Sequence, residues 1–164
     1  MTTCNNLTAL IALIAVGIAY FQLKTNQDKL RLDLYNKRFE IYTKAIDLYL
    51  ELPNSTSIEN MSKEDIDALE TFKILKNSFI KYYRESQFLF KEDSGIHSIL
   101  REILDKLNLI IFDKEHRKSF QDADVEFKIE QQNKVITARN LIESDILKLE
   151  EAMKPYLNFH NKVI

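Results

Sequence analysis

The sequence has few of the residues that interrupt helices or crosslink a fold. Its 164 residues include two glycines, two prolines, one cysteine and no tryptophan. So few glycines and prolines leave little material for hairpin turns and strand ends, which argues against a β-rich fold. A single cysteine excludes an intramolecular disulfide. The composition therefore predicts an all-α protein that is held together by packing.

Charge is absent from the first 23 residues. Residues 7–23 read LTALIALIAVGIAYFQL, and Lys24 follows directly. About 17 residues with a rise of about 1.5 Å each cover about 25 Å, near the lower limit for crossing the hydrocarbon core of a bilayer. We therefore predict a single transmembrane helix over residues 7–23. The alternatives are a cleaved signal peptide, although no Lys or Arg precedes the run, and a buried helix of a soluble protein.

Basic residues follow this run and do not precede it. They are Lys24, Lys29, Arg31, Lys37 and Arg38. Because basic residues near a span stay on the cytoplasmic side, we predict that the N-terminus lies outside. Residues 1–6 are then a short extracytoplasmic segment, and residues 24–164 form a cytoplasmic helical domain. The single cysteine fits a domain on the reducing side of the membrane.

The predicted span has one face of small residues, made of Thr8, Ala12, Ala15 and Ala19. Small side chains at spacings of three and four allow two transmembrane helices to approach closely. A homo-oligomer formed through this face is therefore one interpretation. The other is that alanine is simply common in membrane anchors, and the pairing motif with two glycines is absent.

The rest of the chain shows helical periodicity in four stretches. The expected helices cover residues 27–52, 62–90, 96–111 and about 130–155, and Pro155 should bend or end the last. Loops are expected at 53–60 and 91–95, and a polar connection at 113–128. Four helices with short connections pack most simply as an antiparallel bundle, whereas a long two-helix coiled stalk would need a heptad sustained through the chain. Whether the first helix continues the transmembrane helix stays open.

Three segments carry a resemblance to a known group of proteins. They are KLRLDLYNKRFEIY at 29–42, ESQFLF at 85–90 and KPYLNF at 154–159. Together they resemble uncharacterised small bacterial membrane proteins that have an N-terminal single span and a helical cytoplasmic domain. The resemblance implies a location in the bacterial inner membrane. It implies no active-site residues.

No catalytic or metal-binding pattern is recognisable in the sequence. His97, His116 and His160 are isolated, and the acidic cluster Asp122, Asp124 and Glu126 lacks the glycine and the distal glutamate of a calcium loop. There is no glycine-rich phosphate loop and no serine nucleophile motif. We expect no catalytic residue, no metal site and no cofactor, and a protein that is not an enzyme.

Two functions remain after these exclusions. The first is a membrane-anchored interaction or scaffold module that contacts lipid through residues 7–23 and binds an unknown cytoplasmic protein. The second is a small membrane effector in stress or phage defence that acts by oligomerising its transmembrane helix. A net charge of −2 argues against nucleic-acid binding.

Overall fold

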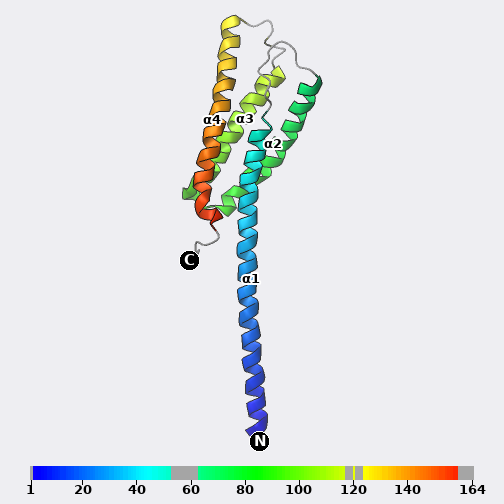
Figure 1. The fold of residues 1–164 in the computed structure, drawn as a ribbon, viewed down its shortest axis with the longest axis vertical. Coiled ribbons are helices and arrows are strands. Elements are labelled where there is room, and N and C mark those ends of the chain that lie inside the picture. The colour runs from blue at the N-terminus through cyan, green and yellow to red at the C-terminus, as the bar shows by residue number, and fades with distance from the viewer. Residues whose placement is uncertain (1, 53–62, 117–119, 121–123, 159–164) are drawn as a thin grey trace. The chain divides into compact units, whose positions relative to one another are not determined.

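A computed structural model describes residues 2–52, 63–116, 120 and 124–158, and for residues 2–9 and 63–65 it describes the backbone alone. Every regular element in this part of the chain is helical, as Figure 1 shows. The elements are α1 (Thr2–Leu50), α2 (Lys63–Leu89), the 3-10 turn η1 (Glu92–Ser94), α3 (Ile96–His116) and α4 (Val125–Leu157). The prediction of an all-α helical bundle is confirmed.

Helix α1 runs without interruption from Thr2 to Leu50. The helix expected at 27–52 is therefore continuous with the helix expected at 7–23. By compactness the chain divides into two units, Met1–Lys37 and Arg38–Ile164. The first unit is a stretch of α1, and the second contains the last turns of α1 together with α2, α3 and α4. The continuity follows from composition, since α1 contains no proline and one glycine.

Within the described residues, no helix has the length and the hydropathy of a membrane span. Residues 7–9 of the predicted span lie outside the residues whose side chains are described.

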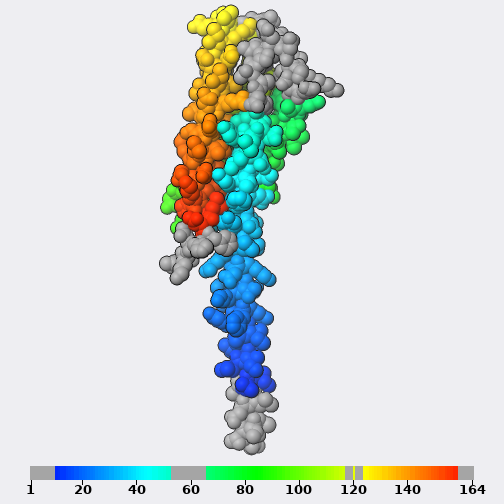
Figure 2. Space-filling view, viewed as in Figure 1, coloured from blue at the N-terminus to red at the C-terminus, as the bar shows by residue number. Residues whose placement is uncertain are grey.

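The core of the second unit forms where all four helices turn an apolar stripe inward. Helix α3 has the most complete stripe, with Leu100, Ile103 and Leu107 all buried. The partners of α3 in the core include Phe72 and Phe79 of α2, Ile142 and Leu149 of α4, and Ile41 and Leu48 of α1. Figure 2 shows the side chains of α4, in orange, against the last turns of α1, in cyan. The spacing of three and four predicted from the sequence therefore identifies the inward faces.

The connection between α2 and α3 lies where the sequence predicts a break. Gly95 has a φ of +70°, in the left-handed region that glycine adopts without steric cost. Ser94 Oγ accepts a hydrogen bond from Ile96 N at 3.4 Å, which satisfies one of the free N–H groups at the start of α3. These two residues reverse the chain within a few positions.

The polar connection predicted at residues 113–128 is wrong at both ends. Helix α3 continues to His116, and its residues Asp113 and Lys114 are buried despite their charge. Helix α4 begins at Val125 rather than near Glu130. At the α3 end the prediction failed because it equated charge with exposure. At the other end, α4 stops at Leu157, two residues after Pro155, as expected.

Several predicted features lie outside the described residues. They are the loop at 53–60, the first residue of the helix expected at 62–90, His160, and Asp122 of the acidic cluster. The side chains of Cys4 and Thr8 also lie outside.

Candidate functional site

The apolar N-terminal stretch of α1 exposes its side chains in every direction. Among them Leu13 is 73% exposed and Val16 70%, and Ile14, Ile18 and Phe21 are more than half exposed. Together with Ala12, Ala15 and Ala19, these positions cover the whole circumference of the helix, since successive residues advance by about 100°. Ala12, Ala15 and Ala19 are exposed too, so three members of the predicted small-residue face are uncovered.

Four of the five basic residues that follow this stretch are exposed. Lys24, Lys29 and Lys37 are exposed, and Arg31 lies 3.9 Å from Asp28, a distance that makes at most a weak surface ion pair. Arg38 is the exception, because it is partly buried in the helical bundle.

Arg38 links three helices. Its Nε donates a hydrogen bond to the carbonyl oxygen of Leu89 at 2.9 Å, at the end of α2. Its guanidinium lies 5.8 Å from the centre of the Phe90 ring and 5.0 Å from that of Tyr156 in α4. The two rings meet edge to face at 5.1 Å. Cation–π contact of this kind stabilises a partly desolvated arginine. Arg38 was predicted only as a topology determinant, and this packing role was missed.

The segments at 29–42, 85–90 and 154–159 meet in this cluster. Arg38 comes from the first segment, Leu89 and Phe90 from the second, and Tyr156 from the third. Nearby in the same bundle, burial and then the carboxylate of Glu150 raise the pKa of Tyr42, so its hydroxyl stays protonated at neutral pH. The cluster stabilises the bundle and contains no group suited to acid–base or nucleophilic chemistry near neutral pH.

A serine–histidine pair joins α2 to α3. Ser86 is buried, and its Oγ donates a hydrogen bond to the carbonyl oxygen of Tyr83 at 2.6 Å. Because this bond uses the only hydroxyl proton, the 2.8 Å contact with His97 is one in which Nδ1–H donates to Ser86 Oγ. His97 Nε2 then accepts from Gln87 Nε2 at 2.9 Å, and the ring stacks on Tyr83 at 4.4 Å.

The direction of these hydrogen bonds decides what the pair can do. A histidine that activates a serine must accept the serine proton, but here the proton is directed to a backbone carbonyl. Ser86 is therefore not arranged as a nucleophile. The pair is a link between two helices.

A buried aspartate joins α3 to α4. Asp145 is 1% exposed, and its two oxygens accept from Lys106 Nζ at 2.5 Å and Lys148 Nζ at 3.0 Å. The hydrogen bond between Lys148 and Asp145 raises the pKa of Lys148. Glu102 Oε2 lies 3.6 Å from the same Lys106 nitrogen. Both carboxylate oxygens are thus neutralised by lysine, as a buried charge requires.

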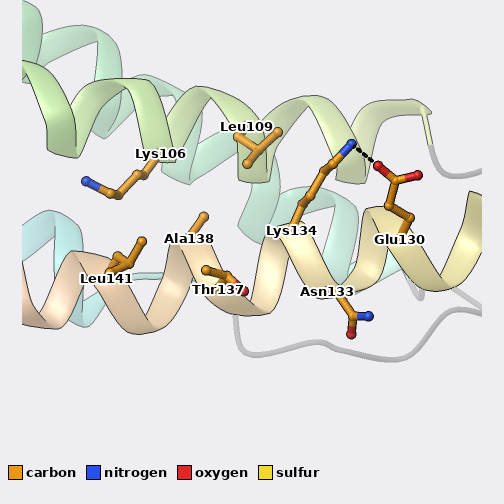
Figure 3. A pocket seen from close by; sticks show the side chains of 8 residues that line it. All are labelled: Lys106, Leu109, Glu130, Asn133, Lys134, Thr137, Ala138 and Leu141. Atoms are coloured by element: carbon orange, nitrogen blue, oxygen red, sulfur yellow. Dashed lines mark ion pairs between the residues drawn. The ribbon is translucent and has the colours of Figure 1, made fainter.

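A shallow groove of about 430 Å³ runs between α3 and α4 (Figure 3). Leu109, Ala138 and Leu141 contribute its apolar surface. Lys134 and Glu130 pair at 2.7 Å along it. Because its lysines are already paired, the groove offers apolar contact rather than an unpaired charge.

Two further contacts tie the outer helices together. Lys73 of α2 pairs with Glu115 of α3 at 2.6 Å. This hydrogen bond lowers the pKa of Glu115 and raises the pKa of Lys73. Tyr82 donates to Glu40 of α1 at 2.8 Å, a hydrogen bond that raises the pKa of the phenol. These groups hold helices in register.

The structure provides no cluster for chemistry within the described residues. No group of three histidine, cysteine or carboxylate side chains is placed to hold a metal ion there. His97 binds Ser86 and Gln87, while His116 contacts Phe112 through its ring and through a 3.0 Å hydrogen bond. In that same part of the chain, no buried side-chain polar atom lacks a hydrogen-bond partner.

Sequence reasoning missed two of the buried polar residues, Asp145 and Ser86, although a signal was present. Asp145 occupies the position between Ile142 and Leu149 at spacings of three and four, on the inward stripe of α4. Ser86 stands in the same way on the stripe of α2. A polar residue within an apolar stripe predicts a buried partner on a neighbouring helix.

Comparisons with known protein families, with curated proteins and with solved structures find no match to this chain.

Proposed function

We propose that this protein is a membrane-anchored helical module: residues 7–23 insert into a lipid bilayer and the helical bundle binds a cytoplasmic protein. The observation that carries the proposal is the exposure of apolar side chains all round α1 from Leu10 to Leu23. A helix that is apolar on every side needs an apolar surrounding, and lipid supplies one.

The pattern favours insertion across the bilayer over attachment to its surface. A helix that lies in the membrane interface has one apolar and one charged face. Residues 10–23 contain no charged side chain. Tyr20 and Phe21 stand near the end of the apolar stretch, where aromatic rings favour the headgroup region. The exposed basic residues after Leu23 support an N-terminus outside and a bundle in the cytoplasm, at the bacterial inner membrane that the resemblance implies.

The anchor is tested with two arginines at its centre. In the double variant Ile14→Arg, Val16→Arg, each arginine adds about 2.5–3.5 kcal/mol to the cost of insertion. We expect the unmodified chain to float with vesicles and resist carbonate extraction, and the double variant to stay in the soluble or aggregated fraction. Leu32→Arg is the matched control, because Leu32 is exposed on the same helix outside the predicted span. Recovery of the unmodified chain in the soluble fraction would contradict the proposal.

The same membranes report the orientation. A membrane-impermeant maleimide should label Cys4, the only cysteine, in intact cells. Labelling that requires opened cells would place the N-terminus inside, and the bundle would then face the exterior.

The partner-binding part of the proposal rests on an exposed stripe of α4. Ile129, Ile136 and Leu147 are exposed and lie on one face, because steps of 7 and 11 residues nearly complete whole helical turns. Aligned apolar side chains on a surface helix are a common anchor for a partner.

This stripe is tested by photo-crosslinking in cells. A photoreactive residue at Ile136 should capture one protein, identified by mass, that the same residue at the exposed Arg101 of α3 does not capture. Adding Leu147→Asp should abolish the capture, since it places a charge in the contact. Equal capture from both positions, or none from Ile136, would rule the stripe out.

A further inference from the structure

The first unit of α1 contains a heptad pattern that the anchor alone does not explain. Seven residues fall at the two core positions of a coiled coil, with alternating spacings of three and four. Position a is occupied by Leu13, Tyr20, Gln27 and Leu34, and position d by Val16, Leu23 and Leu30. All but Gln27 are apolar or aromatic. The pattern covers three heptads, or about 33 Å of helix.

The heptad pattern is informative only after Leu23. Before it nearly every residue is apolar, so any heptad would match. Residues 24–33 contain two apolar side chains, Leu30 and Leu32, and Leu30 falls on the seam while 62% exposed. Leu32 falls on the opposite side of the helix. An exposed leucine between charged residues, seven positions after Leu23 and four before Leu34, indicates a contact surface.

The pattern changes where α1 enters the second unit. Position d becomes basic at Lys37 and again at Lys44, so the a–d seam ends there. Within the bundle α1 buries Ile41 and Leu48, which continue position a, and Ala45, which falls at position e. The apolar d row is therefore confined to the part of α1 before Lys37.

The charges beside the seam favour one kind of partner. Position e is basic, with Lys24 and Arg31, whereas position g holds Asn26 and Asp33. In a parallel pair of identical helices, e faces g of the partner, so basic residues approach Asn26 and Asp33. In an antiparallel pair e faces e, and the basic rows would repel.

We propose that two copies of this protein associate in parallel through the seam from Leu13 to Leu34. The apolar d positions stack against their equivalents, and Gln27 pairs with its own copy and fixes the register, as a single polar core residue does in other coiled coils. Ala12 and Ala19, which fall at position g, leave the two helices room to approach. The proposal does not depend on insertion into a membrane, because Leu30 and Leu34 lie outside residues 7–23.

Cysteine crosslinking of the full chain tests the contact. In a Cys4→Ser background, Leu23→Cys and Leu30→Cys should each form a disulfide-linked dimer in detergent under mild oxidation. Leu32→Cys, on the opposite side two residues away, is the matched control and should not. In an antiparallel pair a residue links to itself only near the symmetry centre, so self-linkage at both positions indicates a parallel pair in register.

Charge variants test the specificity of the contact with Leu30→Cys as the reporter. Asp33→Lys places a basic residue beside the partner's basic row and should slow crosslinking about three- to tenfold, and Asn26→Glu should accelerate it. Shifts in opposite directions support the proposal, whether or not the chain inserts into vesicles. Equal crosslinking from Leu30→Cys and Leu32→Cys, or the same rate in both charge variants, would overturn it, as would linkage of Leu30→Cys to a different protein.

Discussion

Replacing Phe79 with alanine should lower the free energy of unfolding by about 3–5 kcal/mol. Phe79 is 1% exposed in α2 and belongs to the core that α3 and α4 complete. The substitution removes the transfer free energy of the ring and leaves a cavity that helices held on several sides cannot fully close. A small bundle has a total stability of about 5–15 kcal/mol, so the loss would be a large part of it.

The measurement is urea unfolding of the full chain in mild detergent, followed by far-ultraviolet circular dichroism. Phe88→Ala is the matched control, because Phe88 lies on the same helix and is 87% exposed. We expect the control to shift the midpoint little, and the slope to stay unchanged in both variants. If both variants lost the same stability, the assignment of the inward face of α2 would be wrong.

Replacing Asp145 with alanine should lower the free energy of unfolding by about 2–3 kcal/mol. The change leaves Lys106, whose side chain is 19% exposed, without its closest carboxylate. The loss of stability should be smaller than for a fully buried ion pair, since Lys106 retains Glu102 at 3.6 Å and some access to water. The same urea titration gives the value.

A double substitution separates the charge from the packing. Asp145→Leu together with Lys106→Met removes both charges and fills the space with apolar atoms, and we expect it to recover stability to within about 1 kcal/mol of the unmodified chain. Lys148→Ala is the control, because its side chain is 57% exposed and should contribute little. A double variant as unstable as Asp145→Ala would show that Asp145 acts by some route other than its pairing with Lys106.

The helices could be predicted from the sequence because each has a local signal. The stripes that contain Phe72, Leu100 and Ile142 repeat at three and four, and Gly95 marks the turn between two of them. The end of α3 and the start of α4 could not be predicted in the same way. Asp113 and Lys114 are charged but buried, and burial depends on neighbours that are distant in sequence.

The polar contacts between helices could not be predicted from the sequence for the same reason. Lys106 and Asp145 are 39 positions apart, and Arg38 and Leu89 are 51 apart. Such pairings follow from the relative rotation and register of helices, which periodicity leaves undetermined.

The reversal at Gly95 bears on the order in which the bundle folds. Ser86 and His97 are 11 positions apart, whereas the hydrogen bond from Arg139 to the carbonyl oxygen of Leu52 spans 87. Closing a short loop costs less chain entropy than closing a long one, and small loops close in about 10–100 ns. We therefore expect α2 and α3 to pair around Gly95 before the long-range contact between Arg139 and Leu52 forms.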